Sequence, residues 1–327
     1  MSDAPSVSRP DDALKRCDLH LHTRHSRWRR GRVLRARDSY SDPVAGYERA
    51  KAAGMDFVAI TDHDSIDGCL ALLEARPAAA PEIIIGEEVE TRFPDTGQWV
   101  HVNVFGLDEA SHLEVQRLRP NIYELVGFLR RRGLLHVLNH PFLSYRFQKR
   151  PRAYVEEILD LFDHFEAGNS TMPPGHTEAA EAMLAHARSV GLRKTAVAGS
   201  DAHHPDDVAS SFTLAPGRTA AEWLSSVSRG DCLFSTARIG FPRLLANVYR
   251  AVGFYYLELA SGRGRAGMTT VNYLAATAFL PAATVLGVPA FLTCLNEVRQ
   301  RGVLALTRRS LGRMAAAGAP APVEALD

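Results

Sequence analysis

Five short polar clusters, each at the end of an apolar run, constrain this chain more than any other feature of its sequence. Core packing does not call for water-loving side chains at the end of every strand, whereas imidazole and carboxylate groups are ligands of divalent metals. The pattern therefore predicts a metal site and, with it, a metal-dependent hydrolase. In chain order the clusters are His20-Leu21-His22, Asp62-His63-Asp64, Glu87-Glu88, His140-Pro141 and Asp201-Ala202-His203.

Apolar, β-rich runs alternate with helical patterns along the first three quarters of the chain. Strands alternating with helices indicate βαβ units and a mainly parallel sheet, and seven of them favour closure into a barrel. In such a barrel the residues that follow each strand converge on one face, where all five clusters fall. The expected strands are 18–21, 57–61, 83–86, 100–105, 134–138, 165–167, 195–198 and a last one at 231–236. The expected helices include 44–53, 123–132, 154–162 and 177–190, three of them ending near Gly54, Gly133 and Gly191.

Composition limits the class of protein. A net charge of +1 argues against a nucleic-acid-binding surface over the whole protein, and 46% hydrophobic residues are ample for a large core. The four cysteines are far apart, which indicates neither a disulfide framework nor a zinc knuckle and favours the cytoplasm. The predicted organisation is a disordered leader (1–15), the barrel (16–240), a hydrophobic helical segment (241–315) and a flexible tail (316–327).

Residues 266–296 contain no charged side chain, and arginines flank them on both sides. The length allows either a membrane-inserted segment or a helical appendage that covers the barrel or a partner subunit. Pro281 and Pro289 weaken a simple spanning helix. We therefore expect a helical appendage first and membrane association second.

The spacing within the clusters predicts how the ligands are presented. His20 and His22 are two residues apart, as are Asp201 and His203, so each pair shares one face of an extended chain. Glu88 follows the apolar run 83–85, where its carboxylate can bridge two cations, and Glu87 is its immediate competitor. Pro141 predicts an extended turn after His140, which would hold the imidazole at the rim.

The order H-x-H, TDHD, G-x-E, H-P and G-S-D-x-H resembles the motif set of the polymerase and histidinol phosphatase (PHP) superfamily, over residues 16–238. The resemblance implies a distorted (β/α)7 TIM-like barrel that carries two or three divalent cations at its mouth and usually hydrolyses phosphoesters. The family pattern assigns His20, His22, Glu88 and Asp201 to a first ion. Glu88 would bridge to a second ion, completed by His140 and a histidine near Val100, and His63 and His203 would serve a third.

The chain departs from the family pattern at two places. Where many relatives have the mid-chain histidine it has Asn103, with His101 two residues earlier on the same strand face, so His101 is the predicted ligand and Asn103 a supporting residue. The acidic ligand often found shortly after the first motif is replaced by a basic insertion. Asp42, Asp38 or His25 remain the candidates for its place.

These assignments predict hydrolysis of a phosphomonoester or phosphodiester by a metal-bridging hydroxide. The substrate would be a nucleotide, a short nucleic acid or a small phosphorylated metabolite, and the ions zinc, manganese or iron. The predicted catalytic residues are His63, Glu88, Asp201 and His203. Arginines near the first and fourth motifs are expected to bind the anionic substrate, namely Arg27, Arg29, Arg30 and Arg146. Two alternatives stay open: hydrolysis of a non-phosphate ester or amide, and a metal-binding regulatory module at a membrane.

Overall fold

The computed structural model describes residues 14–26, 37–143, 151–262 and 268–318. Their strands form one nine-stranded sheet in the order β7-β6-β5-β4-β3-β2-β1-β8-β9. β4 runs antiparallel to both of its neighbours, while β1, β2, β3, β5, β6 and β7 share one direction. The strands are β1 (Lys15–Asp18), β2 (Phe57–Ile60), β3 (Ile83–Arg92), β4 (Trp99–Phe105), β5 (His136–Leu138), β6 (His164–Asn169), β7 (Thr195–Gly199), β8 (Ser211–Ala215) and β9 (Leu233–Thr236).

The sheet closes where the chain leaves β1 and β7. The residues that follow these strands form a parallel bridge between Leu21 and Ala202, and the Asp201 amide donates to the His20 carbonyl at 2.7 Å. Buried Asp18 accepts hydrogen bonds from the Ser200 amide at 2.8 Å and the Ser200 hydroxyl at 2.5 Å. β8, which pairs with β1, fills the gap between β1 and β7. The first and seventh strands are therefore held together at the end that carries two of the polar clusters.

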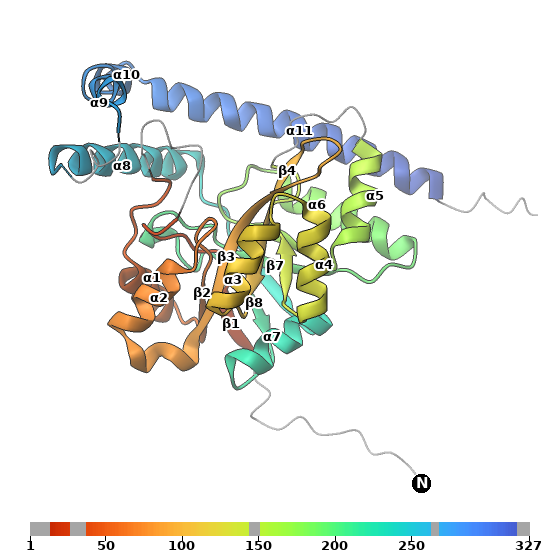
Figure 1. Cartoon of the computed structure of the whole chain (residues 1–327). Helices are drawn as coiled ribbons and strands as arrows, with labels where there is room; N and C mark the ends of the chain where they lie inside the picture. Colours follow the sequence, from red (N-terminus) through yellow and green to blue (C-terminus); the bar gives the residue numbers. More distant parts are fainter. Residues whose placement is uncertain (1–13, 27–36, 144–150, 263–267, 319–327) are drawn as a thin grey trace, which may run out of the picture.

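Helices surround this sheet (Figure 1). α7 lies at one end of the barrel, and its Trp223 is buried in the core and donates to the Lys15 carbonyl at 2.9 Å. α8 and α11 lie at the opposite end. The helices are α1 (Pro43–Ala52), α2 (Asp67–Ala75), α3 (Glu109–Leu118), α4 (Ile122–Arg132), α5 (Pro151–Leu161), α6 (His176–Ser189), α7 (Ala220–Arg229), α8 (Phe241–Ala260), α9 (Thr270–Leu274), α10 (Leu280–Val285) and α11 (Val288–Gly318). Shorter turns are η3 (Pro77–Glu82), η4 (Pro205–Asp207) and the π-helix η6 (Ala275–Phe279).

The predicted α/β barrel with a C-terminal helical region is confirmed, and the differences are local. β8 was not predicted, because its short run alternates small polar and apolar residues without a clear boundary. β3 continues to Arg92, well past the predicted end at 86, because it pairs with β4 up to Arg92 and Trp99. Glu88 therefore lies within a strand and not after one. The helix end predicted at Gly133 is present, and this glycine has a φ of 65° that suits its lack of a side chain.

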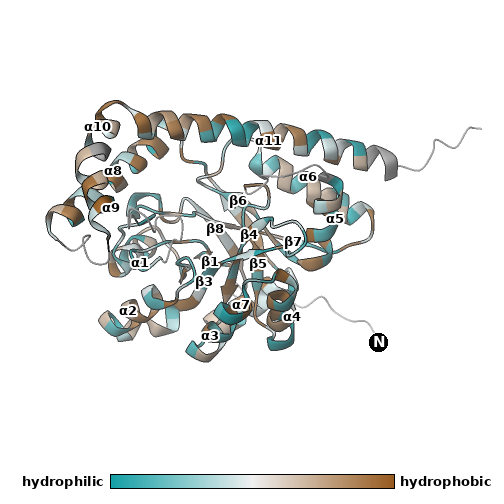
Figure 2. Ribbon diagram, turned by 45° about the horizontal axis from the view of Figure 1, so that its top comes forward, coloured by the Kyte–Doolittle hydropathy of each residue, from teal (hydrophilic) through white to brown (hydrophobic). Residues whose placement is uncertain are grey.

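The C-terminal helices fall into two parts. The second half of α11 belongs to the main core, where Leu304, Leu311 and Met314 are buried against α5 and α6. Around the turn from α10 into α11, Val285 and Leu286 are 87% and 81% exposed, and brown residues mark this end of the helices in Figure 2. No single helix of the described residues meets the length and hydropathy of a membrane span, although α9–α10 and α11, bent by 70°, meet them as a pair.

The membrane association expected for 266–296 stays a prediction. α11 continues to Gly318, three residues into the expected tail, and 319–327 and most of the expected leader lie outside the described residues.

Gly199 offers a test of the barrel closure. A Cβ added there would lie 2.4 Å from the His20 Cβ and 2.6 Å from the His20 amide nitrogen. Gly199→Ala should therefore push β7 away from the chain after β1 and lower the free energy of unfolding by about 1–3 kcal/mol. The matched control is Gly253→Ala on α8, where an added Cβ meets nothing within 4 Å. It should stabilise the helix by about 0.5–1 kcal/mol. Urea denaturation measures both, and equal effects would contradict the close approach.

Candidate metal centre

The barrel closure and the strand ends bring all eight predicted ligands together. The side chains form four groups in which ligand atoms lie within 4.8 Å of one another. Three of the groups are fully buried. The groups are His20, His22 and Asp201; His20, Glu88 and His140; His63, Glu88 and His101; and His22, Asp38, His63 and His203.

Glu88 belongs to two of the four groups and lies 3.3 Å from His22, which belongs to the other two. His63 Nδ1 and His101 Nδ1 each lie 3.0 Å from a Glu88 oxygen, and His140 Nε2 lies 3.2 Å from one. His63 faces Oε2, whereas His101 and His140 face Oε1, which also accepts from the Asn139 side-chain amide at 2.8 Å. The two carboxylate oxygens thus face different sets of histidines, as a bridging carboxylate requires.

Glu87, the competitor from sequence, points away from this centre. Its carboxylate lies 3.0 Å from His112 Nδ1 and accepts from the Gln116 amide at 2.7 Å. Alternation along β3 therefore sends Glu87 to helix α3 and Glu88 to the histidines.

The spacing of the first group fits a shared ion. Two ligand atoms that each lie about 2.1 Å from one ion at tetrahedral angles are roughly 3.4 Å apart. His20 Nε2 lies 3.4 Å from Glu88 Oε1 and 3.5 Å from Asp201 Oδ1. His22 Nε2 lies 3.3 Å from both carboxylates. Both Nε2 atoms are buried without a hydrogen-bond partner among the described residues, so the donor set suits a divalent cation.

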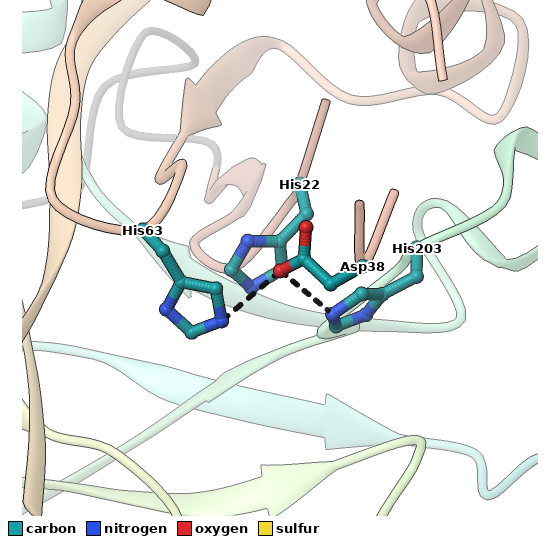
Figure 3. Close-up of side chains that lie close together, drawn as sticks. All are labelled: His22, Asp38, His63 and His203. Carbon is teal, nitrogen blue, oxygen red and sulfur yellow. Dashed lines mark ion pairs between the residues drawn. The ribbon is translucent and has the colours of Figure 1, made fainter. Parts of the chain in front are cut away.

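Asp38 supplies the acid that the sequence left open. Figure 3 shows its carboxylate between the rings of His63 and His203, with His22 behind. Asp38 Oδ2 lies 3.2 Å from His63 Nε2 and 3.7 Å from His203 Nε2. Asp42 instead accepts from the Val44 amide at the start of α1 and pairs with Arg24 at 2.8 Å, and His25 belongs to none of the four groups. Sequence spacing did not separate these candidates because Asp38 and the described residues beside it, 37–42, belong to no helix or strand whose period could orient them.

His63 belongs to two groups through its two ring nitrogens. Nδ1 faces Glu88 and Nε2 faces Asp38. A neutral imidazole has one nitrogen free for a metal, so His63 serves either the Glu88 side or the Asp38 side.

A buried glutamate that the sequence analysis missed positions two of the ligands. Glu166 Oε1 lies 2.7 Å from His20 Nδ1, and Glu166 Oε2 accepts from the His140 amide at 2.9 Å. With the Nδ1 proton directed to Glu166, His20 presents Nε2 to the centre. The signal was a charged residue inside the apolar run 165–167, which is uncommon unless the charge is paired. Asn103, predicted as a supporting residue, donates to the Leu19 carbonyl at 3.1 Å, just before His20.

Two ligands have strained backbones. His140 and Asp201 have φ values of 27° and 55°, in the left-handed region that residues other than glycine seldom adopt. The turn predicted after His140 is present, but it is tight and the backbone at His140 is not extended. The His140 amide donates to Glu166, and its carbonyl accepts from the Leu143 amide at 2.8 Å. These hydrogen bonds stabilise a tight turn against the extended backbone that a residue before proline prefers. Such strain is concentrated at functional sites.

Neighbouring carboxylates raise the pKa values of several predicted ligands, among them His20, His22 and His101. Burial favours the neutral form of His22, but contacts with Asp201 and Glu88 outweigh it and raise its pKa to about 10. For His101, Glu88 and Glu90 likewise outweigh burial and raise the pKa to about 9. Burial favours the protonated form of Glu88, yet His101, His63 and His20 together hold its pKa well below the usual value.

The four predicted substrate-binding arginines, Arg27, Arg29, Arg30 and Arg146, lie outside the described residues. The other predicted site residues are all described, and the structure places each of them in at least one of the four groups.

Comparison with known proteins adds resemblances without a family assignment. No family model matches the chain. The Uncharacterized protein MJ1587 of Methanocaldococcus jannaschii is 34% identical over 76 residues, which are 23% of this chain and 44% of that protein. The match thus spans less than half of the relative's length.

Three solved structures resemble the chain at low identity. PsfC from Pseudomonas syringae has a TM-score of 0.48 at 19% identity and covers 75% of this chain and 99% of its own. An amidohydrolase from Chromobacterium violaceum, with bound sulfate and no metal, has 0.45 at 19%, covering 66% and 97%. A candidate metal-dependent phosphoesterase from Bifidobacterium adolescentis has 0.41 at 16%, covering 58% and 88%. Since none reaches 0.5, the chemistry of the site rests on the side chains of this chain.

Replacing Asp38 tests the fourth group. Asp38→Asn removes the carboxylate charge between His63 and His203, so the purified protein should bind one divalent ion fewer than the wild type. Asp42→Asn is the matched control, because asparagine caps a helix about as well as aspartate does and Asp42 belongs to none of the four groups. Metal analysis by plasma mass spectrometry after equilibration with manganese gives the stoichiometry. The same metal content in Asp38→Asn and the wild type would refute a ligand role for Asp38.

Proton release tests the electrostatics of the centre. Because the raised pKa values keep His22 and His101 protonated near pH 7 without a cation, binding must displace these protons. The affinity for manganese should therefore rise with pH up to about 10, and less steeply above about 9, where His101 has already lost its proton. Titration calorimetry at pH 7 in two buffers of different ionisation enthalpy reports the number of protons released. Identical binding heats in both buffers would contradict this picture.

Proposed function

We propose that this chain is a divalent-metal hydrolase of the PHP superfamily that cleaves phosphoesters. The observation that carries the proposal is the set of ligand atoms around Glu88 and Asp201, spaced at 3.3–3.5 Å from His20 and His22. Mixed imidazole and carboxylate ligands suit zinc, manganese or iron. Divalent ions held there would lower the pKa of a bound water and neutralise charge on the substrate.

The protein's own part is to hold these ligands in one orientation. Three histidines use their second nitrogen to bind the protein, which leaves Nε2 for the centre. His20 Nδ1 contacts Glu166 at 2.7 Å, His22 Nδ1 contacts the Ser26 hydroxyl at 3.2 Å, and His203 Nδ1 contacts the Asp201 carbonyl at 2.9 Å. Such partners fix the tautomer and the ring plane, so that the site is formed before the substrate arrives.

Charge favours an anionic substrate. Glu88, Asp201 and Asp38 contribute three negative charges, so two divalent ions leave a net charge of about +1 and three leave about +3. A phosphate group fits a cationic site of this kind better than a neutral ester or amide does. In this proposal His63, Glu88, Asp201 and His203 act on the reaction by holding the ions, and the arginines at 27, 29, 30 and 146 remain predicted contacts of the phosphate.

The proposal is tested with an aryl phosphate and a bis-aryl phosphate in the presence of manganese or zinc. The wild type should release the aryl alcohol from at least one of them. Glu88→Gln should lower turnover at least about 100-fold and remove bound metal, because a direct ligand contributes more than a supporting residue. Glu87→Gln is the matched control, since the Glu87 side chain faces His112 and Gln116 and not the predicted metal centre. It should keep near-normal turnover.

Three outcomes would overturn the proposal in different ways. Hydrolysis of aryl esters or amides without phosphate release would make the chain a different metallohydrolase. Metal binding without turnover on any substrate would favour a regulatory module. Equal losses in Glu88→Gln and Glu87→Gln would remove the assigned role of Glu88.

A further inference from the structure

A cavity of about 570 Å³ opens beside the group that contains Asp38. Its wall includes Asp38 and His203 on the barrel side and residues of α8 and α11 on the other. This volume is typical of a small-molecule site. The cavity is therefore continuous with the candidate metal centre and reaches the C-terminal helices.

One face of α8 makes the wall apolar. Leu244, Val248 and Ala251 are four and three residues apart, which places them on the same side of the helix. The barrel contributes further apolar side chains to the same cavity: Leu143, Met172 and Ile239. On the α11 side, Asn296 and Gln300 add amide groups.

The wall is part of the folded structure. Arg243 and Asn247 of α8 both contact the buried carboxylate of Asp207, and Arg250 lies 3.3 Å from Asp206. Tyr40 stacks on Phe254 with ring centroids 5.7 Å apart. These contacts fix α8 against the barrel, so the cavity is formed without a ligand.

The charges around the cavity disfavour a polyanion. Arg250 is the single arginine or lysine among the described lining residues, and it pairs with Asp206. Carboxylates are present as well, including Asp207 and Glu297. A nucleic-acid backbone or a second phosphate would find no unpaired cation on the described part of this wall, whereas an apolar group would find side chains to pack against.

We infer that this cavity binds the apolar alcohol part of a phosphoester, such as a long alkyl or an aryl group, with the phosphate placed at the metal centre. The inference rests on the proposed function and narrows it to a substrate class. α8 and α11 then act as the specificity wall of the barrel, with Leu244, Val248 and Ala251 in contact with the apolar group.

The test uses n-alkylphosphonates, which carry a phosphate-like head group on a bond that is not hydrolysed. Binding of methyl- to octylphosphonate to the manganese-loaded protein is measured by titration calorimetry. Each methylene that enters the cavity should tighten binding roughly three- to fourfold. Wild-type affinity that does not change with chain length, or no binding at all, would overturn the inference.

Two alanine-to-tryptophan variants of α8, one in the cavity wall and one outside it, show where the alkyl chain binds. Ala251→Trp fills the cavity and should abolish the dependence on chain length while methylphosphonate affinity stays within about twofold. Ala246→Trp, at an exposed position of α8, should leave the dependence intact. If both variants behave alike, the cavity is not the binding site.

A third variant covers the case in which Ala251→Trp fails to fold. Val248→Thr keeps the shape of the side chain and adds a hydroxyl, so it should weaken octylphosphonate at least about threefold and leave methylphosphonate unchanged. An unchanged octylphosphonate affinity in this variant contradicts the inference.

The turnover assay separates the two proposals. Chain-length-dependent binding without hydrolysis of any phosphoester would retain the cavity and refute the phosphoesterase. Hydrolysis at a rate that does not depend on the length of the alcohol would retain the phosphoesterase and refute the cavity as the site of the alcohol.

Discussion

The structure depends on one constraint, the burial of the Glu88 carboxylate among histidines. Glu88 is 1% exposed, and His20, His22, His63, His101 and His140 all lie within 3.4 Å of its oxygens. A charge removed from water in this way needs positive partners. Protons on the histidines can supply them, but protonated rings so close together repel one another. Divalent ions supply more charge through the same nitrogens.

Hydrogen bonds within the barrel hold Glu88's neighbouring side chains in fixed positions. Asp18 fastens the chain after β1 to the chain after β7, which fixes His20 and His22 relative to Asp201. Glu166 does the same for His20 and His140 from β6. Both carboxylates are buried, so their hydrogen bonds act in a low dielectric and contribute rigidity. Positive φ values at His140 and Asp201 show that the backbone yields to the position of the ligands.

Sequence alone predicted which side chains would meet, because clusters at strand ends converge whenever parallel strands close into a barrel. The eight predicted ligands do lie in one neighbourhood, and His101, the histidine on the strand face that it shares with Asn103, is among them. Sequence did not select Asp38, since residues 37–42 belong to no helix or strand with a period, nor Glu166, since a single acid in an apolar run does not reveal its partner. The backbone at His140 also depends on a contact distant in sequence, the hydrogen bond from its amide to Glu166.

The central claim is that cations bind between these side chains, and anomalous diffraction from crystals of the manganese-loaded protein tests it most directly. The account predicts at least two strong anomalous peaks, one between His20, His22 and Asp201 and one between Glu88, His101 and His140, with Glu88 touching both. Peaks confined to other parts of the molecule, or no peak inside the histidine cluster at saturating manganese, would contradict it.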